Sequence, residues 1–173
     1  MRLLPMQRIL FPIAAFAAVA IYLIWWVTYA GIHFNTRYSI RPPGAVAEVQ
    51  GTTVRLKSLV QAGELSDANG REPALPDPGT VWVVAHLEIF RHDPAKEFPC
   101  GAELLGPEGR RWKESIPKVK RAVSWCQLQN PVGQPVQFES VFMVPARYAD
   151  QLIGVALLDL STAARTSVLT PPL

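Results

Sequence analysis

The pattern of apolar and polar positions divides the chain into two dissimilar parts. Residues 9–32 read ILFPIAAFAAVAIYLIWWVTYAGI and hold no charged residue. A helix of this length reaches about 36 Å, enough to cross a hydrocarbon core of about 30 Å with some tilt. Amphipathic rings prefer the headgroup level, and they gather in the second half of this run at Tyr22, Trp25, Trp26 and Tyr29. The pattern predicts a transmembrane helix over residues 9–32.

A cleaved signal peptide is the alternative for this run. The apolar core of a signal peptide usually spans about 7–15 residues, shorter than the run seen here. Thr28-Tyr29-Ala30 resembles a small-residue cleavage site, so the alternative stays open. If the helix is retained, its expected contacts with lipid or neighbouring helices are Ala14, Ala18, Trp25 and Trp26. Ala14 and Ala18 form a small-x-x-x-small pair that lets another helix approach, although alanine is also simply a good helix former.

The rest of the chain alternates with a period of two residues, which is typical of strands. In residues 81–89 every second residue is apolar, while Trp82, His86 and Glu88 share the opposite face. Similar alternation occurs in residues 54–60 and 136–144. Residues 153–158 are apolar on both faces except for Gly154, as an inner strand would be.

Turn residues separate these runs. Residues 61–79 are rich in Gly, Pro and acidic residues and are expected to form an exposed loop. About seven or eight short strands joined by Gly/Pro turns favour an all-β, two-sheet sandwich. The expected organisation is a cytoplasmic tail (1–8), a transmembrane helix (9–32), a juxtamembrane linker (33–44) and the sandwich (45–173).

Two cysteines, Cys100 and Cys126, bear on the compartment. Disulfides persist in oxidising compartments, and an isolated even pair fits one structural bridge, worth about 3.5 kcal/mol for a loop of this length. Basic residues on either side of the helix orient it only slightly. We therefore expect the N-terminus on the cytoplasmic side of the cell membrane, an extracytoplasmic C-terminal domain and a Cys100–Cys126 disulfide. Two unpaired buried cysteines remain the alternative.

Structural positions spread over roughly residues 45–160 resemble a known family. The first half is Gly79-x-Val81-Trp82-Val83-Val84-x-x-Leu87, Cys100 and Leu104-Leu105-x-x-x-Gly109-Arg110-x-Trp112; the second is Cys126, Gly133, Val141-Phe142-x-Val144-Pro145-Ala146 and Leu152-x-Gly154-Val155-x-Leu157. Together they resemble the DUF4352-like extracytoplasmic immunoglobulin-like domains of bacteria.

The resemblance implies an immunoglobulin-like antiparallel β-sandwich, often with one disulfide, behind a lipid or helix anchor. It carries no catalytic residues. This chain departs from the pattern in having a transmembrane helix where relatives have a lipobox cysteine. It also departs in the basic character of the loop between Cys100 and Cys126. Its arginine, alanine and valine usage is typical of a GC-rich bacterium such as an actinobacterium.

Positive charge is concentrated in residues 110–121, which contain six basic residues and one acidic residue, Glu114. The net charge of this segment is +5, whereas that of the whole chain is +3. Such a segment would attract anionic headgroups, anionic envelope polymers or an acidic protein face. Trp112 could anchor the contact. A solvated loop that prevents aggregation is the alternative reading. The candidate interaction patch is Arg110, Arg111, Trp112, Lys113, Lys118, Lys120 and Arg121.

Sequence signals for catalysis are absent. His86 and His92 do not stand in a zinc-like spacing, and the chain has no G-x-S-x-G elbow and no phosphate-binding glycine loop. We therefore expect no enzyme activity, no cofactor, no metal and no small-molecule substrate. Nucleic acid is a poor partner for an extracytoplasmic domain.

The favoured function is an accessory subunit of a larger bacterial membrane complex, such as a respiratory or envelope assembly. It would contact membrane lipid through its helix and an acidic partner face through its folded domain. The alternative is a stand-alone extracytoplasmic module that binds a ligand or an anionic polymer. A sensor or a periplasmic chaperone also remains open.

Overall fold

The computed structural model describes residues 5–33, 38–49, 51–93, 101–121, 131–157 and 166–172. The chain separates into two compact units, Met1–Arg37 and Tyr38–Leu173. The first unit holds helix α1 (Pro5–His33), whose described side chains are those of Ile13 and residues 15–29. No helix in the described part of the chain is long and apolar enough to cross a membrane.

Apart from Thr28, the described side chains of α1 are apolar or aromatic, and almost all are exposed within this chain. Phe16 is 78% exposed and Ile24 is 68% exposed. The aromatic rings contact one another along the helix, with centroids 5.4 Å apart for Trp25 and Tyr29 and 6.4 Å apart for Tyr22 and Trp25. These pairs follow from helical spacing, because residues three or four apart lie on the same face.

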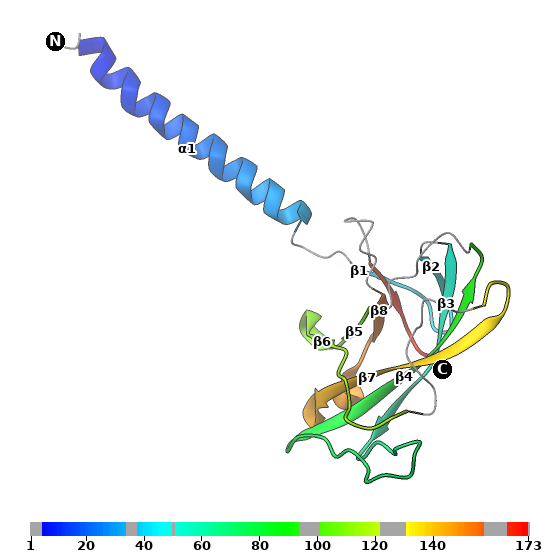
Figure 1. Ribbon diagram of the computed structural model, residues 1–173. Helices are drawn as coiled ribbons and strands as arrows, with labels where there is room; N and C mark the ends of the chain where they lie inside the picture. The colour runs from blue at the N-terminus through cyan, green and yellow to red at the C-terminus, as the bar shows by residue number, and fades with distance from the viewer. Residues whose placement is uncertain are drawn as a thin grey trace. The chain divides into compact units, whose positions relative to one another are not determined.

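The second unit is a sandwich of two sheets, drawn in Figure 1. Among the described residues, one sheet has five strands in the order β1-β9-β8-β5-β6 and the other has four in the order β2-β3-β4-β7. The first comprises β1 (Tyr38–Ile40), β9 (Thr166–Leu169), β8 (Gly154–Leu157), β5 (Ala102–Leu105) and β6 (Arg111–Lys113). The second comprises β2 (Val46–Val49), β3 (Thr52–Ala62), β4 (Thr80–Arg91) and β7 (Pro135–Pro145). Two short 3₁₀ helices, η1 (Pro107–Gly109) and η2 (Ala146–Gln151), follow β5 and β7.

The core lies between the sheets and follows most of the alternation predicted from the sequence. The exception is Val60, which was expected on the same face as Val54 and Leu56 but is 45% exposed, because a β-bulge between Leu56 and Ser58 shifts the register of β3. On β4, Val83 and Leu87 are fully buried and stand opposite Phe142 and Phe138 of β7. On β8 all four residues are buried, which confirms the prediction of an inner strand there. The β-sandwich predicted from the sequence is thus confirmed.

The N-terminal boundary of the sandwich differs from the expected one. β1 lies inside residues 33–44, the expected linker, and pairs in parallel with β9, the last strand. Arg41 extends the contact by donating from its backbone N–H to the carbonyl of Val168 at 2.9 Å. Tyr38 packs against a small buried cluster that includes Leu105. This pairing joins opposite ends of the sandwich sequence, so no local pattern in residues 33–44 could reveal it.

Candidate interaction surfaces

The basic segment passes from one sheet to the other along the side of the sandwich. Its first part, β6, pairs with β5 in the five-stranded sheet. Directly afterwards Glu114 forms a bridge with Phe142 of β7, and the backbone N–H of Ser115 donates to the carbonyl of Val141 at 2.7 Å. The segment therefore closes one side of the core and then runs over the outer face of the four-stranded sheet.

The two arginines at the start of the segment meet carboxylates. Arg110 lies 3.2 Å from Glu108, and Arg111 lies 3.7 Å from Glu103. The guanidinium of Arg110 also lies 4.8 Å from the ring centroid of Tyr148. Both arginine side chains are about half exposed, so these pairs contribute little to stability but lower the net charge that a partner would meet.

Trp112 packs inward. Its ring is partly buried against the main core, and its centroid lies 5.9 Å from that of Tyr148. Gly106 lies so close beneath the ring that a Cβ there would stand 2.5 Å from the indole carbons. The described contacts of Trp112 are therefore internal, whereas the sequence suggested an anchor for a partner.

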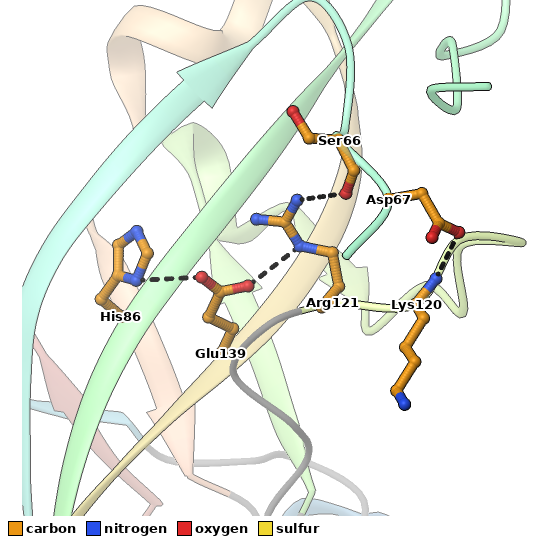
Figure 2. Close-up of polar contacts among 6 residues, drawn as sticks. All are labelled: Ser66, Asp67, His86, Lys120, Arg121 and Glu139. Atoms are coloured by element: carbon orange, nitrogen blue, oxygen red, sulfur yellow. Dashed lines mark hydrogen bonds and ion pairs between the residues drawn. The ribbon is translucent and has the colours of Figure 1, made fainter. Parts of the chain in front are cut away.

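Arg121 closes a polar cluster on the outer face of the four-stranded sheet (Figure 2). Its Nε donates to Glu139 Oε2 at 3.0 Å, and its Nη1 donates to the carbonyl of Ser66 at 3.1 Å. The other oxygen of Glu139 lies 3.4 Å from Nδ1 of His86, and the Glu139 side chain is only 8% exposed. Arg121 is thus held within the molecule from two directions.

Backbone hydrogen bonds extend this cluster. The N–H of Lys120 donates to Asp67 Oδ2 at 3.0 Å (Figure 2). The Lys120 carbonyl accepts from the N–H of Ala68 at 2.7 Å. Asp67 also accepts from the N–H of Asn69 at 2.6 Å. These hydrogen bonds from Asn69 and Lys120 lower the pKa of Asp67 below its ordinary value, because they stabilise its charged form. The segment from 115 to 121 and the loop from 62 to 79 are fastened together here.

Three cations of the predicted patch remain available to a partner. The side chains of Lys113, Lys118 and Lys120 are exposed, and none of them forms an ion pair with the described residues. The three arginines all have carboxylate partners, which lie outside the 110–121 window. The net charge of +5 counted from the sequence of residues 110–121 is therefore larger than the charge that this surface presents to a partner.

The loop over residues 61–79 is only partly exposed. Leu65 is 1% exposed and pairs with Ala74 through a β-bridge, and the Trp82 indole donates to the Ala74 carbonyl at 3.1 Å. Leu65 packs with Trp82, Val84 and Val141 in a second buried cluster on the outer face of the four-stranded sheet. The sequence offered one hint of this cover, because Trp82 and Val84 place apolar side chains on the face expected to be polar.

A groove lies beside this cluster, between residues 72–77 and residues 116–119. It has a volume of about 440 Å³, and Trp82 and Met143 are among its lining residues. Leu75 and Ile116, which also line it, are 71% and 79% exposed. Sequence reasoning missed this groove, since its walls come from segments about 40 residues apart.

Several predicted residues receive no structural account. Cys100 and Cys126 lie outside the described residues, as does the side chain of Ala14. In α1, Ala18, Trp25 and Trp26 are exposed. Within the described ranges no group of three or more His, Cys, Asp or Glu could hold a metal ion.

Comparisons with known proteins identify the fold alone. No family model matches the chain, and no curated protein matches it. An uncharacterised β-sandwich protein from Clostridium difficile 630 is similar, with a TM-score of 0.52, 8% identity, and coverage of 79% of this chain and 95% of that one. A conserved hypothetical protein from Bacillus anthracis has a TM-score of 0.49, 9% identity, and coverage of 66% and 86% respectively. The class that the fold and the first similarity define is a β-sandwich protein.

Proposed function

We propose that this protein is a non-enzymatic accessory subunit of a larger bacterial membrane complex. One transmembrane helix over residues 9–32 would hold it in the cell membrane, with its N-terminus inside. An extracytoplasmic immunoglobulin-like domain of the DUF4352-like kind would contact an acidic face of a partner. The observation that carries the proposal is the set of exposed lysines on the side of the sandwich that have no carboxylate partner among the residues that the structure describes.

Strand order supports the immunoglobulin-like part of the proposal. An immunoglobulin domain sets a G-F-C-C′ sheet against an A-B-E-D sheet. Here β9-β8-β5-β6 can be aligned with G-F-C-C′, and β3-β4-β7 can be aligned with A-B-E. The pairings of β4 with β7 and of β5 with β8 are antiparallel, as B with E and C with F would be.

The membrane anchor rests on the sequence. The uncharged run over residues 9–32 extends beyond the α1 side chains that the structure describes. The exposed apolar side chains within α1 agree with a helix that faces lipid or other helices, because water would penalise so much exposed apolar surface. The cluster of Tyr22, Trp25 and Tyr29 suits a headgroup region.

The acidic partner follows from the charges. Lys113, Lys118 and Lys120 project from one continuous segment that is fixed to both sheets. Arg121 and the backbone of Lys120 hold its far end in place, so the lysines stand on a defined surface instead of a free loop. Cations held at fixed positions give an acidic partner complementary contacts and speed its association.

Co-purification from membranes in mild detergent tests this function. The full chain should recover a membrane protein in constant stoichiometry. The double substitution Lys113→Glu with Lys118→Glu should reduce recovery, and raising the salt concentration should do the same. Arg41→Glu with Arg55→Glu, an equal change of charge at exposed positions outside the basic segment and the loop over residues 61–79, is the matched control. A lone monomer on native gels, or equal loss with both double variants, would contradict the proposal.

The compartment is tested separately by the cysteines. If the domain is extracytoplasmic, Cys100 and Cys126 form a disulfide, and neither should react with a thiol reagent on intact, unreduced cells. Both should react after reduction. Ready labelling of both cysteines without reduction would overturn the extracytoplasmic placement. The contact with an acidic partner face is tested independently by the co-purification.

A further inference from the structure

The groove beside Trp82 has two walls that are tied together at one end. One wall is residues 72–77 and the other is residues 116–119. Just beyond them, the Lys120 N–H donates to Asp67, and the Arg121 guanidinium donates to the carbonyl of Ser66. These bonds fix the spacing of the walls, so the groove exists before anything binds.

The bottom of the groove is apolar and already satisfied. Trp82 is 4% exposed, and its indole N–H donates to the carbonyl of Ala74. Met143, opposite Trp82 in the ladder between β4 and β7, lines the same space. Such a bottom offers an occupant apolar contact and no unsatisfied donor, which selects for a large apolar side chain.

The walls carry apolar side chains in water. Leu75 at 71% and Ile116 at 79% are more exposed than any other large apolar side chain in the described part of the sandwich. They come from opposite walls of one groove. A single exposed aliphatic side chain is ordinary, but two such side chains that flank an apolar groove form a patch typical of a binding surface.

Charge completes the description. Glu72 and Asp77 line one wall, and neither carboxylate forms an ion pair with the described residues. Lys118 stands on the other wall. Negative charge therefore outweighs positive charge around the apolar bottom, which disfavours an acidic occupant or a lipid phosphate and favours a cationic one.

We infer that this groove binds an extended peptide segment of a partner protein, with a large apolar residue over Trp82 and an adjacent Lys or Arg near Glu72 and Asp77. Because Leu75 and Ile116 on its walls are largely exposed, the groove can be reached from the surface, which suits a peptide better than an enclosed small molecule. This goes beyond the proposed contact with an acidic face, because the charge preference of the groove is the opposite one.

The test uses the full chain in detergent micelles, with ¹³C in the methionine methyl groups. The chain has three methionines, so Met143 reports from the groove while Met1 and Met6 serve as internal references. Met143→Leu assigns the signal. The probe is a synthetic peptide with one leucine between two lysines in a glycine–serine frame. Matched peptides carry serine in place of leucine or glutamates in place of the lysines.

The Lys-Leu-Lys peptide should shift the Met143 signal in a saturable manner. Replacing its leucine by serine should weaken binding about tenfold, since burial of a leucine side chain is lost. Leu75→Ser and Ile116→Ser in the protein should each weaken binding severalfold, and Asp77→Asn with Glu72→Gln should weaken it about threefold at low salt. Because all four side chains line the surface, the variants should still fold, which thermal melting checks.

Ile40→Ser, at a 58% exposed position on β1, and Glu48→Gln, at an exposed position on β2, are the matched controls and should leave binding unchanged. No saturable shift of Met143 with the Lys-Leu-Lys peptide would overturn the inference. Equal binding of the glutamate peptide would overturn the cationic occupant. A Met143 shift that depends on protein concentration alone would mean that the occupant of the groove is a second copy of the chain and would overturn the peptide. A shift that depends on detergent concentration alone would mean that the occupant is lipid and would overturn it as well. None of these results would bear on Lys113, so the proposed function is judged separately.

Discussion

Arg121 Nε lies 3.0 Å from Oε2 of Glu139, and this ion pair fastens the end of the basic segment to β7. The two side chains are 20% and 8% exposed, so water screens the pair far less than it screens the pairs at Arg110 and Arg111. The second oxygen of Glu139 is occupied by His86 at 3.4 Å. One carboxylate thus connects β4, β7 and the segment that forms a wall of the groove.

Removing this carboxylate should destabilise the domain. Glu139→Ala leaves the partly buried Arg121 without its charge partner, and we expect a loss of about 2 kcal/mol in the free energy of unfolding. Glu108→Ala, which breaks the exposed pair with Arg110, should cost less than about 0.5 kcal/mol. Urea unfolding of both variants measures the difference. Equal losses would mean that burial of the Glu139 pair contributes nothing.

Glu114 should make stability depend on pH. It is half-buried at the bridge to Phe142, and burial raises the pKa of its carboxyl, an effect that the hydrogen bond with Ser140 partly offsets. A raised folded-state pKa means that the folded protein holds the proton more tightly than the unfolded chain. Stability from this group is therefore complete below the unfolded-state pKa, 4.5, and is lost as pH rises through the folded-state value.

Glu114→Gln should abolish this dependence. The variant should be more stable than the original at neutral pH and nearly equal to it well below the unfolded-state pKa, because the neutral amide resembles the protonated acid. Urea unfolding across the acidic to neutral range checks this. Glu48→Gln, at an exposed site on β2, should show no such divergence. A Glu114→Gln variant that is less stable than the original at neutral pH would contradict the sign of our argument.

Gly154 should tolerate no side chain. A Cβ built there would collide with the backbone carbonyl of Leu169, on the neighbouring strand β9, and would crowd Val168. Since backbone cannot yield as a flexible side chain can, Gly154→Ala should cost about 2–4 kcal/mol. At Gly63, nothing lies within 4 Å of an added Cβ, so Gly63→Ala should change stability by less than about 0.5 kcal/mol. Thermal or urea unfolding distinguishes the two.

Core and surface should respond differently to truncation. Phe142 is fully buried between the sheets, and Phe142→Ala should cost about 3–5 kcal/mol by leaving a cavity. Lys118→Ala removes an exposed side chain and should barely alter the unfolding midpoint while weakening any contact with an acidic partner. Similar destabilisation by both would contradict this division between core and surface.

The strands that can be seen in the sequence are those whose two faces differ or whose faces are both buried. In β4 the buried Val83 and Leu87 alternate with outward residues, and in β8 every residue is buried, so the local pattern carries the information. β1 is different. Three residues that include the exposed Ile40 become a strand only because the last strand, β9, lies beside them. No window of neighbouring residues contains that partner.

The candidate sites show the same division more strongly. The sequence identified the basic residues but not their carboxylates, because Glu139 stands 18 residues from Arg121 and meets it only through the fold. It identified Trp112 as a possible anchor but could not show that the ring packs against the core near Tyr148. The expectation of an exposed loop over residues 61–79 was wrong at Leu65, which is buried against Trp82.

The sequence by itself determined the two-part organisation, the β-sandwich class and most of the inward positions of the long strands, because hydrophobic burial imposes a period of two on neighbouring residues. Tertiary structure alone decided which charges are paired, where the sandwich begins and where the groove lies. Each of these depends on atoms from distant segments meeting within a few ångströms, and contacts of that kind leave no periodic trace along the chain.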